Sequence, residues 1–237
     1  MNEHYIRWYT PHLSREFEML VFGDGGGLPL VLFPTSYGRF YQNKEFGLVE
    51  SIRPFVDAGK VTVYCPDGID LESWYNRGIH PADRVKTHVA YENVIVGDVF
   101  DYARRKGGRH HVAVGGASFG GYHAANIAFK HPGAVSAMFS LSGAFDMSNF
   151  MDGYRDDNFY FNNPTDYMAH CPDPWRYGHM GIFLGTGDWD ICRSANFQMS
   201  GILHDKGIGH WLDERRWCAH DWNWWREMLP TYVSRVV

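Results

Sequence analysis

A serine set between glycines carries the strongest chemical signal in the sequence. The run Gly116-Ala117-Ser118-Phe119-Gly120 fits the pattern G-x-S-x-G, with a strand-like run before it and a helical run after it. In a sharp strand-to-helix turn, glycines let the backbone pack closely and the serine hydroxyl is presented for attack. The sequence therefore predicts that Ser118 is a nucleophile. The alternative is a glycine-rich connection whose serine only caps the helix.

A serine nucleophile needs a general base, and a histidine near the C-terminus fits this role best. Of the histidines that follow Ser118, only His220 lies between the last predicted strand and the last predicted helix. The loop that carries it can reach back over the serine. We therefore predict that His220 is the base.

The base needs a carboxylate to orient it, and two neighbouring aspartates compete for this role. Asp188 and Asp190 both follow the strand-like run 181–187, and each stands three residues after a glycine. The length of that run favours Gly187 as the turn, and so Asp190 as the acid. Asp188 is the next choice, and Asp146, which follows the preceding predicted strand, comes third.

Aromatic residues occur beside these positions. Trp74 and Tyr75 follow a predicted strand, and Trp189 stands between the two candidate acids. We predict that these three side chains bind the substrate by stacking on a planar group. The alternative is that they pack in the core.

The elements that must position these residues alternate between strands and helices. The chain begins with three strand-like runs (residues 4–10, 15–23 and 28–35), which indicate an antiparallel start. Further strands are predicted over 61–66, 110–116, 134–143, 181–187 and 210–218, and helices over 39–58, 90–105, 122–130, 195–206 and from 222 onward. This alternation predicts an α/β fold with a mostly parallel sheet, antiparallel N-terminal strands and helices on both faces.

A chain of 237 residues is long enough for one large core, and we expect a single domain over residues 1–237. The segment 146–179 departs from the alternation, because it is rich in Asn, Asp, Pro and aromatic residues without a clear period. It is too long for an ordinary connection. We predict an irregular excursion there that faces the substrate.

Composition excludes several classes of protein. The formal net charge of −5 gives no basic footprint for nucleic acid or for an anionic membrane surface. No apolar stretch is long enough for a membrane span, and the N-terminus does not resemble a signal peptide. We therefore expect a cytoplasmic protein whose four scattered cysteines are reduced and buried.

Together these motifs resemble the esterase D-like family of the α/β-hydrolase superfamily, and also feruloyl esterases and mycolyltransferases. The resemblance rests on the elbow, on the order Ser118, Asp190, His220, and on the runs ESWYN and HPGAVSAMFSLSGAFD. It implies the α/β-hydrolase fold and hydrolysis of small or aromatic carboxylic esters through an acyl-enzyme. It also implies an oxyanion hole formed by the main-chain N–H groups of Phe119 and Ser36, the latter in a loop similar to the H-G-x-x-G loop of such enzymes.

The resemblance implies no metal and no organic cofactor, and the partner is a small-molecule ester. Three alternatives remain open. An acyltransferase would use the same three residues with another acceptor, and a hydrolase-fold binding protein would have lost activity. A metalloenzyme is the third, but the sequence has no H-E-x-x-H motif. Whether the chain forms a homo-oligomer is also open.

Overall fold

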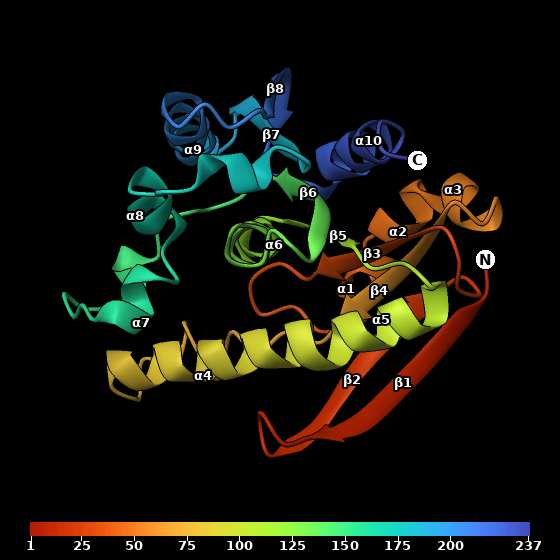
Figure 1. Cartoon of the computed structure of the whole chain (residues 1–237), viewed down its shortest axis with the longest axis horizontal. Coiled ribbons are helices and arrows are strands. Elements are labelled where there is room, and N and C mark those ends of the chain that lie inside the picture. Colours follow the sequence, from red (N-terminus) through yellow and green to blue (C-terminus); the bar gives the residue numbers. More distant parts are fainter.

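A central sheet of eight strands organises the molecule (Figure 1). The computed structural model describes residues 1–237. The strands are β1 (Glu3–Thr10), β2 (Arg15–Phe22), β3 (Leu28–Phe33), β4 (Val61–Pro66), β5 (Val112–Ala117), β6 (Val135–Leu141), β7 (Gly181–Trp189) and β8 (Trp211–Ala219). Their order in the sheet is β1-β2-β4-β3-β5-β6-β7-β8. Strand β2 is antiparallel to both of its neighbours, and all other pairs are parallel. The predicted sheet and its antiparallel start are confirmed.

Helical segments connect the strands. They are α1 (Gln42–Glu45), α2 (Leu48–Ser51), α3 (Arg53–Asp57), α4 (Pro81–Asn93), the π-helical η1 (Val94–Val99), α5 (Phe100–Gly107), α6 (Phe119–Lys130), η2 (Ser148–Phe150), α7 (Asp157–Tyr160), α8 (Pro164–Ala169), η3 (Pro174–Tyr177), α9 (Arg193–Asp205) and α10 (Trp222–Val233). None of them combines the length and the apolar character needed to span a bilayer.

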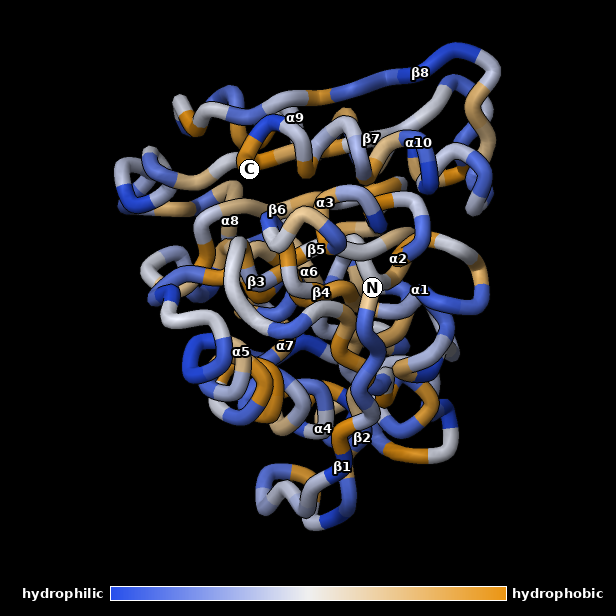
Figure 2. The backbone as a smooth tube through the Cα atoms, turned by 90° about the vertical axis from the view of Figure 1, so that its right-hand side faces the viewer, coloured by the Kyte–Doolittle hydropathy of each residue, from blue (hydrophilic) through white to orange (hydrophobic).

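The sheet separates two hydrophobic cores, because successive side chains of a strand point to opposite faces. In β3, Val31 and Phe33 join the core beneath α4, α5, α6 and α9. Leu30 and Leu32 join the core beneath α2, α3 and α10. Figure 2 shows the hydrophobic segments gathered at these central strands, whereas β8 at the sheet edge is largely hydrophilic. Helices therefore cover both faces, as predicted.

Two predicted helices differ from the observed ones. The helix predicted over 39–58 is broken into α1, α2 and α3, and Gly47 has a left-handed φ of 73° between the first two. The helix predicted over 90–105 begins earlier, at Pro81, and continues through η1 into α5. Its first turns are polar and carry the uncommon cap His80, so hydrophobic periodicity alone did not reveal them.

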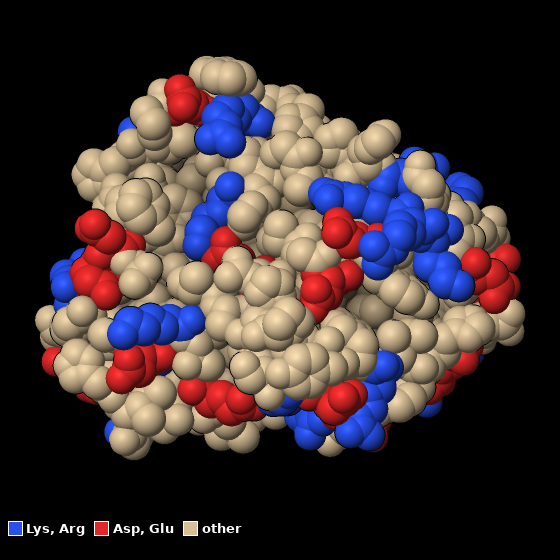
Figure 3. Space-filling model, turned by 60° about the horizontal axis from the view of Figure 1, so that its bottom comes forward, with Lys and Arg blue, Asp and Glu red and all other residues tan.

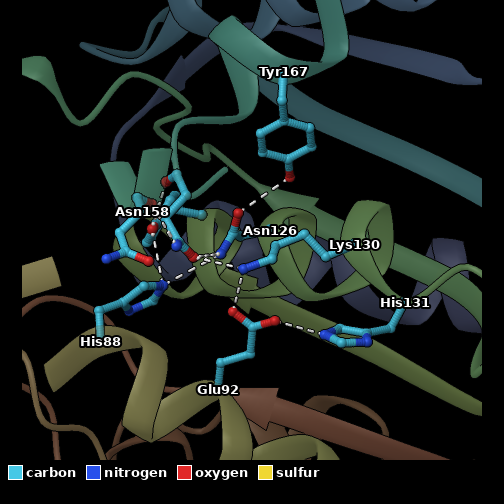
Figure 4. Close-up of polar contacts among 9 residues, drawn as sticks. His88, Glu92, Asn126, Lys130, His131, Asn158 and Tyr167 are labelled. Carbon is cyan, nitrogen blue, oxygen red and sulfur yellow. Dashed lines mark hydrogen bonds and ion pairs between the residues drawn. The ribbon is translucent and has the colours of Figure 1, made fainter. Parts of the chain in front are cut away.

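The excursion lies between β6 and β7 and contains the short helices η2, α7, α8 and η3. A buried polar network connects it to α4 and α6 (Figure 4). Lys130 of α6 donates to Glu92 of α4 and, at 3.0 Å, to Asn162 of the excursion. Asn126 also donates to the Asn162 side chain, at 3.0 Å. The excursion is thus tied to α6, the helix that directly follows Ser118.

Charged side chains of both signs are interspersed on the face shown in Figure 3. Blue and red groups adjoin one another there, and no face-wide basic area is visible. Ion pairs such as Arg39–Glu18 and Arg77–Asp152 connect neighbouring surface segments. Pairs of this kind contribute little to stability when they are exposed.

Candidate active site

The turn between β5 and α6 holds Ser118 in a strained conformation. Its backbone has φ 55° and ψ −118°, a region that residues other than glycine rarely occupy. The surrounding glycines are required by close packing: a Cβ on Gly116 would lie 2.6 Å from the backbone of Gly120. A Cβ on Gly120 would lie 2.6 Å from the carbonyl oxygens of Phe33 and Pro34. The start of α6 therefore lies directly against the end of β3.

The structure brings Ser118, His220 and Asp190 into one hydrogen-bonded chain. The Oγ of Ser118 lies 2.9 Å from Nε2 of His220. The Nδ1 of the same ring lies 2.8 Å from Oδ1 of Asp190. Ionised Asp190 can only accept, which assigns the proton to Nδ1 and leaves Nε2 free to accept from the serine hydroxyl. This is the arrangement in which a histidine can remove the serine proton.

The environment of Asp190 favours its charged form. Burial acts to raise the pKa of Asp190, but hydrogen bonds from His220, Ser142 and the Cys192 N–H outweigh burial and lower it. Thr186 adds a hydrogen bond from its hydroxyl to Oδ2, at 3.0 Å. A carboxylate held ionised in this way keeps the imidazole ring oriented and can stabilise its positive form.

The other two candidate acids have different partners. Asp188 accepts the main-chain N–H of Cys218 at 3.2 Å, which links the ends of β7 and β8. Asp146 accepts the main-chain N–H of Ser148 at 2.9 Å, within its own loop. Of the three aspartates, only Asp190 contacts His220.

The loop after β3 lies next to the elbow. The N–H of Phe119 opens α6, where the first N–H groups have no partner within the helix. The main-chain N–H of Ser36 donates no hydrogen bond within the protein, and its hydroxyl contacts the hydroxyl of Tyr75 at 2.8 Å. Gln42 accepts the neighbouring N–H of Thr35 at 2.8 Å and so fixes this loop from the other side.

Aromatic rings extend from the elbow toward the surface. The ring of Tyr75 lies 5.4 Å from that of Phe119, 4.8 Å from that of Phe150 and 4.3 Å from that of Tyr37. Tyr37 is half exposed and has a φ of 61°. Tyr75 thus lies near the elbow, and its contact with a substrate stays a prediction.

Trp74 does not lie where the sequence led us to expect it. Its side chain is fully buried, with 0% exposure, and packs against His88, Tyr122 and Phe150. Residues 71–75 form turns, so the neighbouring side chains of Trp74 and Tyr75 point in different directions. Trp74 belongs to a small core beneath the excursion and has no surface for a substrate.

Trp189, in contrast, is exposed. Its indole ring meets that of Trp217 edge-on, with ring centroids 5.1 Å apart, and both are more than half exposed. Trp189 directly precedes Asp190, and Trp217 lies three residues before His220. This exposed tryptophan pair therefore lies at the ends of β7 and β8, close in sequence to Asp190 and His220.

The comparisons with known proteins agree with this architecture. A family profile described as "alpha/beta hydrolase fold" matches residues 76–170, less than half of the chain. No curated protein sequence matches the chain. A solved ferulic acid esterase superposes with a TM-score of 0.80 at 18% identity, covering 100% of this chain and 99% of that one. The chain has the α/β-hydrolase fold.

Two further solved structures superpose over almost their whole length. The S-formylglutathione hydrolase FrmB from Staphylococcus aureus gives a TM-score of 0.78 at 14% identity, covering 99% of each chain. MPT51 (FbpC1) from Mycobacterium tuberculosis gives 0.78 at 15% identity, covering 100% of this chain and 98% of that one. At such identities the likeness concerns the α/β-hydrolase fold alone.

Several residues of this α/β-hydrolase site were missed by the sequence reasoning. Thr186 in β7 and Ser142, directly after β6, both hydrogen-bond to Asp190. Ser142 has a positive φ of 57°, which the sequence did not predict. Cys192 was grouped with the buried thiols. All four cysteines are free, but Cys171 and Cys192 are only half-buried. The closeness of Cys192 to Asp190 in the sequence was the signal that could have identified it.

Proposed function

We propose that this chain is a serine esterase that hydrolyses small or aromatic carboxylic esters through an acyl-enzyme. The observation that carries the proposal is the continuous chain of hydrogen bonds from Ser118 through His220 to Asp190, with distances of 2.9 and 2.8 Å. An intact nucleophile, base and acid in this geometry support catalysis, because each group meets the partner that its role needs.

The first half of the reaction forms the acyl-enzyme. Nε2 of His220 takes the proton from Ser118 as Oγ attacks the ester carbonyl carbon. The ionised Asp190 stabilises the imidazolium that results. His220 then gives the same proton to the leaving alcohol oxygen, and the acyl group remains on Ser118.

The oxyanion that forms during attack needs two N–H donors. We assign this role to the N–H groups of Phe119 and Ser36. The unpartnered state of the Ser36 N–H and the close approach of Gly120 to the end of β3 support this assignment. The contact between Tyr75 and the Ser36 hydroxyl fixes the loop that presents the second donor.

In the second half, water replaces the alcohol. His220 removes a proton from water, the hydroxide attacks the acyl carbon, and Ser118 leaves with the proton returned by His220. Atoms and charges balance over the cycle: one ester and one water give one acid and one alcohol. The chain's own side chains perform every proton transfer.

The aromatic surroundings support the substrate class. Tyr37, Tyr75 and Phe150 lie beside the elbow, and Trp189 stands next to Asp190. Such rings favour contact with planar or apolar groups. Two of the similar structures are named a ferulic acid esterase and an S-formylglutathione hydrolase, which supports an ester or thioester of a small acid.

Location and partners follow from the same proposal. Four free cysteines suit a reducing compartment, and we place the protein in the cytoplasm. The net charge of −5 supports a small-molecule partner over nucleic acid.

The test is hydrolysis of p-nitrophenyl acetate and of an aromatic acyl ester by the purified chain. Ser118→Ala should abolish turnover, with the loss on the order of 10⁵–10⁶-fold in kcat that removal of a serine nucleophile produces. Ser200→Ala is the matched control, because the Ser200 hydroxyl also contacts a histidine, His210 Nε2 at 2.7 Å. It should retain full activity.

A fluorophosphonate probe gives an independent readout. It should label the wild type and Ser200→Ala, and it should leave Ser118→Ala unlabelled. Labelling that survives in a folded Ser118→Ala variant, or turnover that does, would contradict the proposal.

A further inference from the structure

A half-buried thiol lies next to the acid and the base. Cys192 is the N-cap residue of α9, two residues after Asp190, and its main-chain N–H donates to Asp190 Oδ1 at 2.9 Å. One ligand atom from each of Asp190, Cys192 and His220 lies within 4.8 Å of the other two. The esterase mechanism uses the carboxylate and the imidazole but has no role for the thiol.

The three donors form a ligand set typical of zinc. Thiolate, imidazole and carboxylate are the usual protein ligands of Zn²⁺, and sites with three protein ligands leave the fourth position to water. Bond lengths of about 2.0–2.3 Å place two ligands of one ion roughly 3–4 Å apart. The three side chains therefore need only small shifts to bind one ion.

The charges of such a site also balance. A thiolate and a carboxylate together offset a divalent cation, so a half-buried site would carry no net charge. Burial, followed by the nearby Asp190 charge, raises the pKa of the Cys192 thiol to about 12. The ion must therefore displace the thiol proton, which leaves to solvent. The imidazole stays neutral and changes at most its tautomer.

We propose that Asp190, Cys192 and His220 form a binding site for Zn²⁺ or another thiophilic divalent cation, and that its occupation inhibits the enzyme. If the ion binds Nδ1 of His220, it replaces the hydrogen bond to Asp190. If it binds Nε2, it occupies the atom that would receive the Ser118 proton. In both cases His220 can no longer act as the base. The inhibition rests on the proposed esterase function, whereas the binding does not.

Binding is tested without activity. Cd²⁺ is titrated into the Ser118→Ala variant, which keeps all three ligands, and thiolate-to-cadmium charge-transfer absorption is recorded in the ultraviolet. The absorption should saturate at one ion per chain. It should disappear in Ser118→Ala/Cys192→Ser and persist in Ser118→Ala/Cys171→Ser. Cys171 is the matched control, because it is also half-buried but lines a cavity of about 340 Å³ with Phe129 and Tyr177 at the other end of α6.

Inhibition is tested on the active chain. Zn²⁺ should inhibit hydrolysis of p-nitrophenyl acetate, a chelator should restore it, and Mg²⁺, which prefers oxygen ligands, should have no effect. The Zn²⁺ concentration that halves activity should rise by at least about tenfold in Cys192→Ser and in Cys192→Ala, and it should not change in Cys171→Ser.

Each result bears on one of the two proposals. Absence of the charge-transfer absorption in Ser118→Ala, or its survival without Cys192, overturns the metal site. A wild-type chain that binds Cd²⁺ through Cys192 but hydrolyses no ester overturns the proposed function and leaves the metal site standing. Zn²⁺ binding through Cys192 with undiminished ester hydrolysis overturns the inhibition.

Discussion

Two serine hydroxyls of this chain contact histidine rings. The two pairs differ in the second hydrogen-bond partner of the histidine ring. Behind His220 stands the ionised carboxylate of Asp190. Behind His210, whose Nε2 contacts Ser200, stands the main-chain carbonyl of Ile208 at 2.9 Å. A carbonyl can orient the ring, but it offers only a dipole to the imidazolium that catalysis creates. A full negative charge stabilises that ion much more strongly.

The first residue-scale prediction concerns the choice between the two neighbouring aspartates. Asp190→Asn should lower kcat for p-nitrophenyl acetate by roughly 10³–10⁴-fold, because an amide neither fixes the tautomer nor stabilises the imidazolium. Asp188→Asn changes only a contact with the Cys218 N–H and should lower kcat by less than about tenfold. Initial rates at saturating substrate measure both. A larger loss in Asp188→Asn would show that the wrong aspartate had been chosen.

At the scale of elements, the site depends on the contact between α6 and the end of β3. Gly120 has no room for a side chain, since a Cβ would lie 2.6 Å from two carbonyl oxygens. The oxyanion donors proposed above lie on the two sides of this contact. In the proposed mechanism, the separation of β3 and α6 therefore matters for catalysis as well as for stability.

The second prediction tests that contact. Gly120→Ala should lower the free energy of unfolding by about 1–3 kcal/mol, because the added methyl group forces the helix away from the backbone of β3. Gly133→Ala is the matched control, since nothing lies within 4 Å of a Cβ there. It should change the free energy by less than about 0.5 kcal/mol. Urea denaturation measures both, and equal effects would contradict the close approach.

The polar network between α4, α6 and the excursion makes stability depend on pH. His88 is fully buried, and burial, followed by the charges of His123 and Lys130, holds its pKa well below the usual 6.5. For Glu92, burial acts to raise the pKa, but the contacts with His131 and Lys130 outweigh it and lower it below 4.5. In both cases the unfolded chain binds a proton before the folded chain does, so stability falls as the pH falls.

The third prediction separates these two groups by their pH windows. Protonation of His88 in the unfolded chain should begin to lower the free energy of unfolding below about pH 6.5, and protonation of Glu92 below about pH 4.5. Each group should lower it by up to about 1.4 kcal/mol per pH unit. Free energies of unfolding from urea titrations at pH 7.0, 5.5 and 4.0 measure this. His88→Gln should remove the loss of unfolding free energy that begins below about pH 6.5, and leave the loss below about pH 4.5 unchanged. Glu92→Gln should have the opposite pattern. If folded His88→Gln still loses as much stability as the wild type between pH 7.0 and 5.5, His88 is not the cause of that loss.

The elbow and the order of the elements were predictable because they depend on local chemistry. Glycines at Gly116 and Gly120 mark a tight turn, and alternating apolar runs mark the strands. The orientation of Trp74 was not predictable, because the turns of residues 71–75 decide which neighbour faces the core. The position of Cys192 relative to His220 was not predictable either, since it depends on how the ends of β7 and β8 meet.

At the scale of the whole molecule, the sheet ends at β8, whose outer edge has no partner strand. Exposed edges can pair with other chains unless charges oppose it. The strand carries Asp213, Glu214, Arg215 and Arg216 in succession, and Glu214 and Arg216 are exposed. Figure 2 shows β8 largely in the hydrophilic colour, and charges of this kind oppose pairing of the edge with another chain.

The fourth prediction follows from that edge. The double variant Glu214→Val/Arg216→Val should associate or aggregate at concentrations where the wild type keeps its state, because two β-branched apolar residues replace the charges. Light scattering over a concentration series measures this. Valine at both Asp83 and Lys86, an exposed ion pair on helix α4 and away from either edge strand, serves as the control. Equal association in both variants would assign the effect to lost charge in general.

The distance along the chain between Ser118 and His220 also has a consequence for biosynthesis. The two residues are 102 positions apart, and Asp190 lies between them. Ser118, the proposed nucleophile, therefore leaves the ribosome well before His220, the proposed base. His220 is held in place only after β8 and α10 have packed onto the sheet. Until then Ser118 is an ordinary alcohol. If the proposed mechanism holds, the growing chain is not acylated by cellular esters or thioesters before β8 and α10 have packed onto the sheet.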